Sequence, residues 1–459
     1  MIHRIAILGA AGDLTFRYLL PALARLYAAG RLPPDFRILA FDRRKWEGEA
    51  YRRIAATGLA EHAEGVDQAV RRTFIEMVDY RYADASDRRS LAAALAPIDG
   101  PLIVYLALPP AVFAPAIEAI VEAGVPSGSR IAVEKPFGED LASAQRLNAL
   151  LHRTFHEDAV TRVDHFLALP GAQSIVGLRF ANRLFEPLWN SKHIARVEIV
   201  WDETLALEGR ASYYDHAGAL RDMLQSHLLQ LLALLAMEPP AHADERGLRD
   251  RKLDALQAVR RLSPDEVCAS SIRARYTAGR IGDRAVPAYV EEKGVDRSRE
   301  AETFAQVRLA IDNERWRGVP FVLRSGKALC RDRHEIAVYF RPASLGIFSD
   351  PGTNVLRLAL DSGHIHLGIN ASDDQDFFTV RPSALVSEAA PDTLPAYARL
   401  LLGVMAGDSS LSVRNDEAEE SWRIVEPILA AWGSGIPPMQ EYSAGSDGPT
   451  SADDTRAAA

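Results

Sequence analysis

The sequence predicts two folded domains: a doubly wound α/β domain, followed by an α+β domain built on a large antiparallel β-sheet. Short apolar segments alternate with helical segments up to about residue 170, which is typical of parallel β-α-β units. Beyond that point, successive segments alternate apolar and polar residues, which is typical of antiparallel strands. The length of 459 residues is sufficient for two or three domains.

Composition narrows the class of protein. The chain is 48% hydrophobic and 25% charged, and its net charge of −9 provides no overall attraction to nucleic acid or to an anionic membrane. Cys268 and Cys330 stand in no metal-binding spacing, which argues against a disulfide framework or a thiolate zinc site. The apolar segment 5–11 is too short to span a bilayer. We therefore expect a cytoplasmic protein with no metal, no nucleic-acid partner and no membrane partner.

The elements of the first domain follow in order. A buried strand at 5–8 runs into a glycine turn, and apolar residues at helical spacing predict a helix over 19–30. Pro21 is tolerable only in the first turn of that helix or at an interruption of it. Further strands are expected at 37–41, 102–108 and 130–133, and further helices at 112–124 and 141–152.

The second domain is expected to carry its strands at 195–201, 303–311, 336–340, 355–360 and 364–370. Between the first two of these lies the stretch 218–237, which is apolar on nearly every side and should therefore be a buried helix. The segment 441–459 is rich in Ser, Gly, Asp, Thr and Ala, which predicts a disordered tail. The predicted domains are therefore 1–170 and 171–440, followed by the tail.

The glycine turn is a candidate nucleotide site. Gly9 and Gly12 follow the first strand, where glycines allow backbone N–H groups to approach a pyrophosphate, although the same pattern also makes plain tight turns. Asp42 ends the second strand, where a carboxylate would bond the ribose hydroxyls of NAD. The three basic residues that begin at Arg43 would instead suit the 2′-phosphate of NADP, or form an exposed charged segment. A nicotinamide dinucleotide is therefore predicted, with the choice between the two left open.

Histidines mark a second candidate site. His165 follows Asp164 directly, and His227 lies in the stretch expected to be a buried helix. By composition alone, a buried histidine is more often a hydrogen-bonded core residue than a catalytic group. The charged side chains of Lys135, Glu203 and Lys327 carry no stronger signal when each is taken singly.

Ordered motifs along nearly the whole chain resemble those of the glucose-6-phosphate dehydrogenase family. The matching segments are Gly9–Leu14, Tyr105–Pro110, Glu134–Gly138, Arg162–His165, Leu178–Arg183, Arg221–Asp222, Gln225–Gln230, Asn313–Trp316, Gly318–Leu329 and Trp422–Ile428. The resemblance implies a Rossmann-type NAD(P)-binding domain followed by a catalytic and dimerisation domain. It also implies a homodimer or a homotetramer.

The resemblance implies roles for individual residues. His227 matches the general base that takes a proton from the sugar C1 hydroxyl, and Asp164 matches its carboxylate partner. The implied substrate-binding residues are Lys135, His165, Glu203, Asp222 and Lys327. The implied cofactor-binding residues are Gly9, Ala11, Gly12, Asp13, Leu14, Arg43 and Lys135, to which Asp42 is added. The family indicates NADP, whereas Asp42 indicates NAD.

Departures from the family pattern fall in the expected phosphate pocket. A tyrosine and a lysine that follow the family's histidine are replaced by Phe166 and Leu169, and a basic residue is replaced by Asp332. We therefore keep three hypotheses. The first is oxidation of the C1 hydroxyl of an aldose 6-phosphate, by default glucose 6-phosphate giving 6-phosphogluconolactone. The second is NAD(P)-dependent oxidation or reduction of another sugar or a cyclitol. The third is a non-catalytic sugar or nucleotide sensor.

Overall fold

A computed structural model describes residues 2–209, 211–348, 352–372, 379–387 and 394–449. The chain forms two compact units. Unit 1 comprises Met1–Ala168, His242–Arg249 and Asp392–Glu419, and unit 2 comprises Leu169–Ala241, Asp250–Pro391 and Glu420–Ala459. The first segment of unit 1 ends at Ala168, and the predicted domain boundary at residue 170 stays a prediction. The two later segments of unit 1 carried no sequence signal of their membership.

Unit 1 contains a seven-stranded sheet in the order β17-β6-β5-β4-β1-β2-β3. Its strands are β1 (Arg4–Leu8), β2 (Arg37–Asp42), β3 (Val78–Tyr82), β4 (Ile103–Leu106), β5 (Arg130–Glu134), β6 (Val160–Val163) and β17 (Ser412–Val413). The first six run parallel, and β17 is antiparallel to β6. The predicted parallel sheet is confirmed, and its carboxyl edge carries the Gly9 turn, Asp42 and Asp164.

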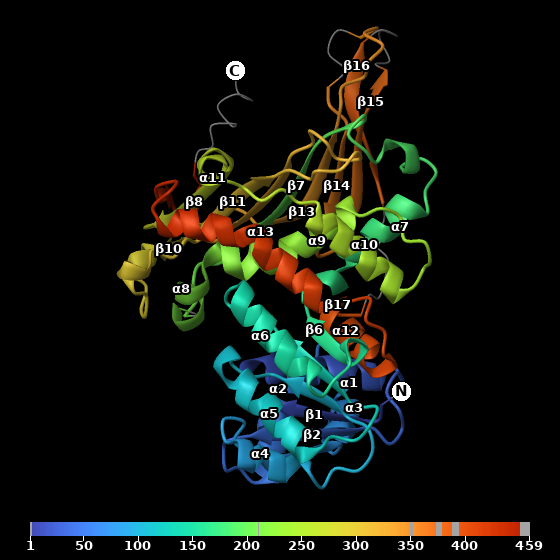
Figure 1. The fold of residues 1–459 in the computed structure, drawn as a ribbon, viewed down its shortest axis with the longest axis vertical. Helices are drawn as coiled ribbons and strands as arrows, with labels where there is room; N and C mark the ends of the chain where they lie inside the picture. The colour runs from blue at the N-terminus through green and yellow to red at the C-terminus, as the bar shows by residue number, and fades with distance from the viewer. Residues whose placement is uncertain (1, 210, 349–351, 373–378, 388–393, 450–459) are drawn as a thin grey trace. The chain divides into compact units, whose positions relative to one another are not determined.

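Helices lie on both faces of this sheet (Figure 1). Alternating side chains of the strands pack into two apolar clusters that include residues of these helices. Ile5 and Ile7 belong to one apolar cluster, whereas Ala6 and Leu8 belong to another. The first cluster includes residues of α1 (Leu20–Ala28), α2 (Gly48–His62), α3 (Gln68–Ile75) and α12 (Ala396–Ala406). The second includes residues of α4 (Arg88–Leu95), α5 (Phe113–Ala123) and α6 (Leu141–His152). Burial of both strand faces is what makes β1 almost uniformly apolar.

The first helix is interrupted where the sequence predicted a difficulty. It begins at Asp13, passes through the π-helical segment η1 (Thr15–Leu19) and continues as α1, with Pro21 in the first turn of α1. Proline cannot donate the hydrogen bond of a regular helix interior. The wider turn of η1 accommodates that missing donor.

Unit 2 contains a nine-stranded sheet in the order β16-β15-β14-β13-β7-β12-β11-β8-β18. Its strands are β7 (Ile194–Asp202), β8 (Ser271–Thr277), β11 (Phe304–Leu309), β12 (Phe321–Gly326), β13 (Arg333–Phe340), β14 (Val355–Ala359), β15 (Ile365–Ser372), β16 (Val380–Val386) and β18 (Gln440–Ser443). The sheet is mostly antiparallel, as predicted, but β7 pairs with β12, and β8 with β18, in parallel.

The apolar stretch over 218–237 is helical and buried, but it is not one straight helix. It comprises the end of α8 (Ala211–Ala219), the π-helical segment η6 (Leu220–Leu228) and α9 (Leu229–Ala236). Gly218 interrupts the helix with φ 67° and ψ 172°. Every residue of α9 is buried, because nearly every side of that segment is apolar.

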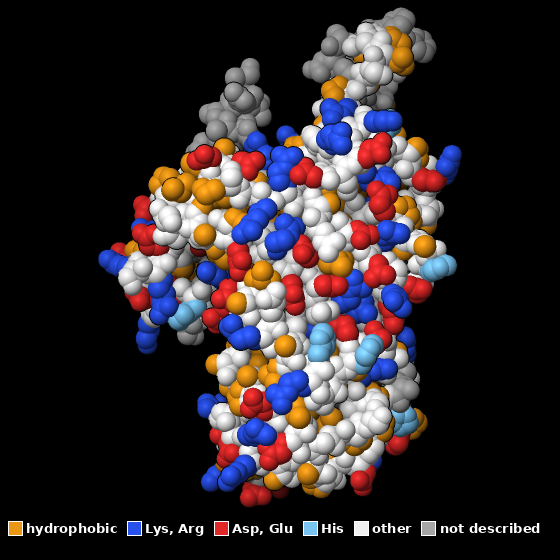
Figure 2. All heavy atoms as spheres, in the orientation of Figure 1, with side chains coloured by type: hydrophobic (Ala, Val, Ile, Leu, Met, Phe, Trp, Pro, Cys, Tyr) orange, Lys and Arg blue, Asp and Glu red, His pale blue; other side chains and the backbone are white. Residues whose placement is uncertain are grey.

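Further elements complete the two units. The longer ones are α7 (Pro170–Phe180), α10 (Glu245–Gln257), α11 (Pro264–Ser270) and α13 (Asn415–Gly433). The short ones are β9 (Gly279–Ile281), β10 (Arg284–Val286), η2 (Pro110–Val112), η3 (Glu157–Ala159), η4 (His165–Ala168), η5 (Glu186–Leu188), η7 (Tyr289–Glu291) and η8 (Arg297–Arg299). None of the helices in the described ranges combines the length and apolar character needed to cross a bilayer. On the face drawn in Figure 2, Lys and Arg side chains are interspersed with Asp and Glu side chains.

The predicted disordered tail requires a correction. Residues 440–443 form β18, which pairs with β8, and Tyr442 is buried. The hydroxyl of Tyr442 donates to the carbonyl oxygen of Lys327 at 2.7 Å, so one aromatic residue anchors a segment whose composition is otherwise typical of disorder. Residues 450–459 of the predicted tail lie outside the described part of the chain.

Candidate active site

The glycine turn of unit 1 is held tightly by its own backbone. Gly9 has φ 88°, and a Cβ there would lie 2.1 Å from the carbonyl oxygen of Ala107, so only glycine fits. The N–H groups of Gly9 and Ala10 donate to the carbonyl oxygen of Phe41, and that of Gly12 donates to Gly9. Because these donors are already used, a pyrophosphate would be met by the first turn of the helix that begins at Asp13.

Asp42 fastens this turn to the end of β2. Its Oδ2 accepts from the N–H of Ala11 at 3.1 Å, and its Oδ1 accepts from the N–H of Arg44 at 3.1 Å. The Arg44 guanidinium returns a 2.9 Å bond to the carbonyl oxygen of Ala11. The hydroxyl of Tyr51 donates to Ala10 at 2.9 Å, a support that the sequence reasoning missed. Asp42 therefore shapes the turn, whatever it binds.

A pocket of about 220 Å³ opens beside the turn. It is lined by five predicted cofactor residues, Gly9, Ala11, Gly12, Asp42 and Arg43, together with residues such as Arg44, Asp84, Ser86 and Val112. Asp13 and Leu14 lie outside the described lining. A helix N-terminus, two arginines and a carboxylate at the end of a strand form a suitable donor and acceptor set for a nucleotide diphosphate and its ribose.

A buried glutamate lies at the carboxyl end of β5. Glu134 accepts a hydrogen bond from the hydroxyl of Tyr105 at 2.5 Å and another from Tyr397 of α12. Burial raises the pKa of Glu134 to about 7, although both tyrosines and the adjacent Lys135 act in the opposite direction. The nearby charge of Asp164 adds to the rise. The sequence motif contains Glu134, but nothing in it indicated this cluster.

The same tyrosine contacts the predicted phosphate-binding histidine. The rings of Tyr397 and His165 are stacked, with centroids 5.7 Å apart and planes inclined by 14°. His165 opens the helical turn η4 directly after Asp164, whose Oδ1 accepts from the N–H of Phe166 at 3.0 Å. Phe166 is buried, so its side chain packs in the core. Tyr397 of α12 thus helps to orient His165, which lies far earlier in the chain.

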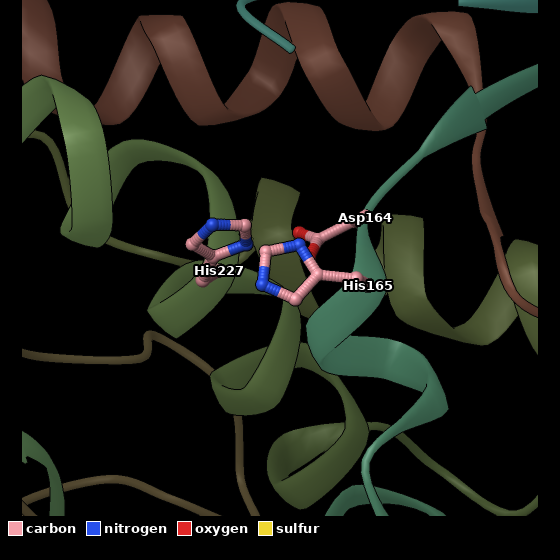
Figure 3. A group of neighbouring side chains, drawn as sticks. All are labelled: Asp164, His165 and His227. Atoms are coloured by element: carbon pink, nitrogen blue, oxygen red, sulfur yellow. The ribbon is translucent and has the colours of Figure 1, made fainter. Parts of the chain in front are cut away.

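Figure 3 draws three candidate side chains: Asp164 and His165, which follow β6 of unit 1, and His227, which lies in η6 of unit 2. Asp164 and His227 are almost completely buried, each 1% exposed, and His165 is half-buried. One carboxylate and two imidazoles can exchange protons with a bound alcohol. Such a donor set is also one that metal ions accept, although the sequence predicted no metal.

Unit 2 contains the three remaining predicted substrate residues, and each of them has a side-chain partner. The Nζ of Lys327 lies 2.6 Å from Oε2 of Glu203, and the same ammonium lies 5.3 Å from the ring centroid of Tyr214. Asp222, in the first turn of η6, accepts a 3.1 Å bond from the hydroxyl of Tyr213. Paired charges with partial exposure form a site at which sugar hydroxyls can exchange with existing partners.

The unexpected acidic residue of unit 2 has a local partner. Oδ1 of Asp332 accepts from the backbone N–H of Thr204 at 2.6 Å, directly after Glu203. The neighbouring imidazole of His334 stacks on Trp201, with centroids 3.7 Å apart, and its Nδ1 lies 2.5 Å from Asp361. Asp332 therefore holds the segment that carries Glu203, a role that needs no bound phosphate.

Comparisons with known proteins cover both units. A family model described as the glucose-6-phosphate dehydrogenase NAD binding domain matches residues 6–173. A second, described as the glucose-6-phosphate dehydrogenase C-terminal domain, matches residues 176–459.

Relatives and solved structures agree with these matches. The glucose-6-phosphate 1-dehydrogenase of Treponema pallidum is 39% identical over 98% of this chain and 93% of its own length. That of Mycolicibacterium smegmatis is 38% identical over 97% and 94%. A structure of glucose-6-phosphate dehydrogenase in complex with its substrate glucose-6-phosphate has a TM-score of 0.90, with 32% identity over 99% of this chain and 97% of that one.

Proposed function

The chain belongs to the glucose-6-phosphate dehydrogenase family, and from that premise we propose that it oxidises the C1 hydroxyl of glucose 6-phosphate to 6-phosphogluconolactone, with NAD(P) as hydride acceptor. The observation that carries the proposal is the similarity to glucose-6-phosphate 1-dehydrogenases over nearly the full length of both chains.

The proposed chemistry assigns the proton to His227. Its imidazole accepts the proton of the C1 hydroxyl, while the hydride bonded to C1 leaves and the C1–O bond becomes the lactone carbonyl. The nucleotide supplies the ring that accepts the hydride. The carboxylate of Asp164 stabilises the imidazolium that results, in the manner of other carboxylate and histidine pairs. Release of that proton to solvent restores His227.

The remaining site residues are proposed to bind substrate. Glu203, Asp222 and Lys327 would accept from and donate to the sugar hydroxyls, with Lys135 assisting beside the cofactor. His165 would bind the phosphate. Each hydrogen bond to a charged group contributes about 1.5–3 kcal/mol, so the substitutions at Phe166, Leu169 and Asp332 predict weaker phosphate binding than the family pattern implies.

The cofactor is NAD or NADP, held by the turn of unit 1. We propose a preference for NAD. The carboxylate of Asp42 lines the pocket beside the turn, and so does Asp84, whose pKa is lowered by hydrogen bonds from Ser86 and by the charge of Arg43. A 2′-phosphate would meet two carboxylates at this place, and part of the charge of Arg43 is already balanced.

One observation favours a second candidate. The buried Phe166 and the acidic Asp332 stand where family members carry polar and basic phosphate ligands, which favours a sugar substrate without a 6-phosphate. The same hydride chemistry would serve that substrate. Assembly into a homodimer or homotetramer and a cytoplasmic location remain proposals that follow from the family.

An assay of nucleotide reduction separates the candidates. Formation of NADH and NADPH is followed with glucose 6-phosphate, glucose and a panel of modified sugars. The proposal requires kcat/KM for glucose 6-phosphate to exceed that for glucose. A higher value for an unphosphorylated sugar would establish the second candidate. Absence of turnover with every sugar would leave the sensor hypothesis.

A further inference from the structure

Asp222, and the ion pair of Glu203 and Lys327, together make up what we call the sugar-binding group of unit 2. We infer that Glu302 is a positioning residue that holds Asp222 and Lys327 in place. It acts through the first turn of η6, which carries Asp222 and leads to His227, and through the segment that carries Lys327. The functional part of the inference rests on the function proposed above.

The side chain of Glu302 caps η6. Its Oε1 accepts from the backbone N–H of Leu220 at 2.9 Å, and its main-chain oxygen accepts from the N–H of Ala219 at 3.1 Å. The first N–H groups of a helix have no partner within the helix, and a negative charge there is favoured by the helix dipole. Glu302 thus fixes the end at which η6 begins, two residues before Asp222.

Gly218 allows the carboxylate to approach this closely. A Cβ at Gly218 would lie 2.4 Å from Oε1 of Glu302, and 2.7 Å from both Oε2 and Cδ. All three nearest atoms therefore belong to the same carboxylate. Gly218 also has a positive φ that other residues rarely adopt. The kink and the carboxylate form one complementary unit, and neither tolerates extra bulk.

Residues on the two sides of the kink contribute to the sugar-binding group. Tyr213 and Tyr214 lie before Gly218, and Asp222 lies after it. The hydroxyl of Tyr213 reaches Asp222, and the buried ring of Tyr214 lies beneath the Lys327 ammonium. A change in the kink angle would therefore separate Asp222 from Tyr213 and remove the support under Lys327.

The neighbour of Glu302 holds the backbone of Lys327. The carbonyl oxygen of Thr303 accepts from the N–H of Lys327 at 2.9 Å, and the Thr303 hydroxyl is hydrogen-bonded to the Tyr442 hydroxyl at 2.9 Å. Tyr442 in turn donates to the carbonyl oxygen of Lys327. Two consecutive residues, Glu302 and Thr303, thus connect the start of η6 to the backbone of Lys327.

The burial of Glu302 is unusual for a residue that serves only to cap a helix. The side chain is only 7% exposed, and burial raises the pKa of its carboxyl, against the opposing effects of the Leu220 N–H and of Arg221 and Arg273. Burial, and to a lesser extent the charge of Glu302, raises the pKa of the buried Tyr214 and Tyr289. Caps at exposed helix ends are commonly Ser, Thr, Asp or Asn, which carry no such desolvation cost. We attribute the presence of a buried glutamate here to its role in positioning the sugar-binding group.

The test uses Glu302→Gln, Glu302→Ala and Gly218→Ala in the full chain, with Glu291→Gln as a control at an exposed glutamate of the same unit. Hydrogen exchange of peptides covering 219–228 is measured without ligand, together with the thermal midpoint and the separate KM values for sugar and nucleotide. In Glu302→Gln, we expect the hydrogen-exchange rate of residues 219–228 and the KM for the sugar each to rise about tenfold. The KM for the nucleotide should stay within about twofold of wild type. Glu302→Ala and Gly218→Ala should show larger changes in the same two quantities.

The inference is overturned if Glu302→Gln and Gly218→Ala leave exchange and sugar KM at wild-type values. It is equally overturned if both KM values rise together with a fall in the thermal midpoint, since that pattern indicates general destabilisation. Should Glu302→Ala fail to fold, the glutamine variant still decides. The exchange measurement needs no substrate, so a wild type without activity would contradict the proposed function while this arm still tests Glu302.

Discussion

The glycine turn of unit 1 and the sugar-binding group of unit 2 are built in opposite ways. In the turn, side chains hold backbone: Asp42 and Tyr51 bond to main-chain atoms of residues 10 and 11. In the sugar-binding group, by contrast, side chains hold one another: the ammonium of Lys327 pairs with Glu203, and Asp222 accepts a hydrogen bond from the hydroxyl of Tyr213.

The difference in construction determines which chemical groups each region can recognise. A backbone turn at a helix N-terminus binds phosphate oxygens through groups that every residue has, so substitution changes it only by altering its shape. Paired side chains read individual hydroxyls, so each substitution changes specificity directly. Substitutions near the glycine turn are therefore expected to change recognition less than substitutions in the sugar-binding group. The sugar-binding group is expected to determine the substrate.

The largest expected effect concerns the proton acceptor. His227→Asn should lower kcat about 10³-fold with little change in either KM, because a general base acts mainly in the transition state. Steady-state kinetics measures both quantities, with His193→Asn at an exposed histidine as the control. Wild-type turnover in His227→Asn would show that the base is another residue.

Glu134 provides a test of unit 1 through pH. Its pKa in the folded protein, about 7, lies above its ordinary value of 4.5, so the folded state keeps the proton better than the unfolded state does. The stability that this provides is fully present below pH 4.5 and is lost as the pH rises through 7. Glu134→Gln, which mimics the protonated form, should therefore gain on wild type by on the order of 3 kcal/mol between pH 4.5 and pH 9.

Thermal unfolding of both proteins across this pH range measures that gain. The control is Glu139→Gln, an exposed glutamate of the same unit, which should run parallel to wild type. Parallel curves for Glu134→Gln and wild type would show that folding does not raise the pKa of Glu134.

Asp42 allows a smaller effect to be tested in the glycine turn. Asp42→Ala should raise the ratio of kcat/KM for NADP to that for NAD about tenfold, because a carboxylate that repels the 2′-phosphate is removed. The same change removes the acceptor of the Ala11 N–H, so a modest loss of affinity for both nucleotides should accompany it. Asp99→Ala, in an exposed loop, serves as control. An unchanged ratio would show that Asp42 only shapes the turn.

The smallest expected effect is none at all. Carboxylate and imidazole groups such as those of Asp164, His165 and His227 can bind metal ions, but the proposed chemistry uses them for proton transfer and phosphate binding. Dialysis against a chelator should therefore leave kcat and KM unchanged, as measured before and after addition of Zn²⁺ or Mg²⁺. Loss of activity that a metal ion restores would reassign the group.

Sequence reasoning located most of the fold because its signals are local. The alternation of strands and helices predicted the parallel sheet of unit 1, and the apolar stretch 218–237 predicted a buried helix. The prediction was wrong about the start of the tail, because the burial of Tyr442 depends on residues more than a hundred positions away. It also missed that 392–419 belongs to unit 1, for the same reason.

Local sequence accounts for the conformations that carry the predicted site residues: a glycine turn before a helix, a carboxylate before a histidine, and a histidine in an apolar helix. These depend on neighbours within a few residues. Which charged side chains are buried, and which groups donate hydrogen bonds to them, depends instead on long-range packing. Tyr397 reaches Glu134, and Glu302 reaches Leu220, across long stretches of chain, because packing rather than local preference brings those segments together.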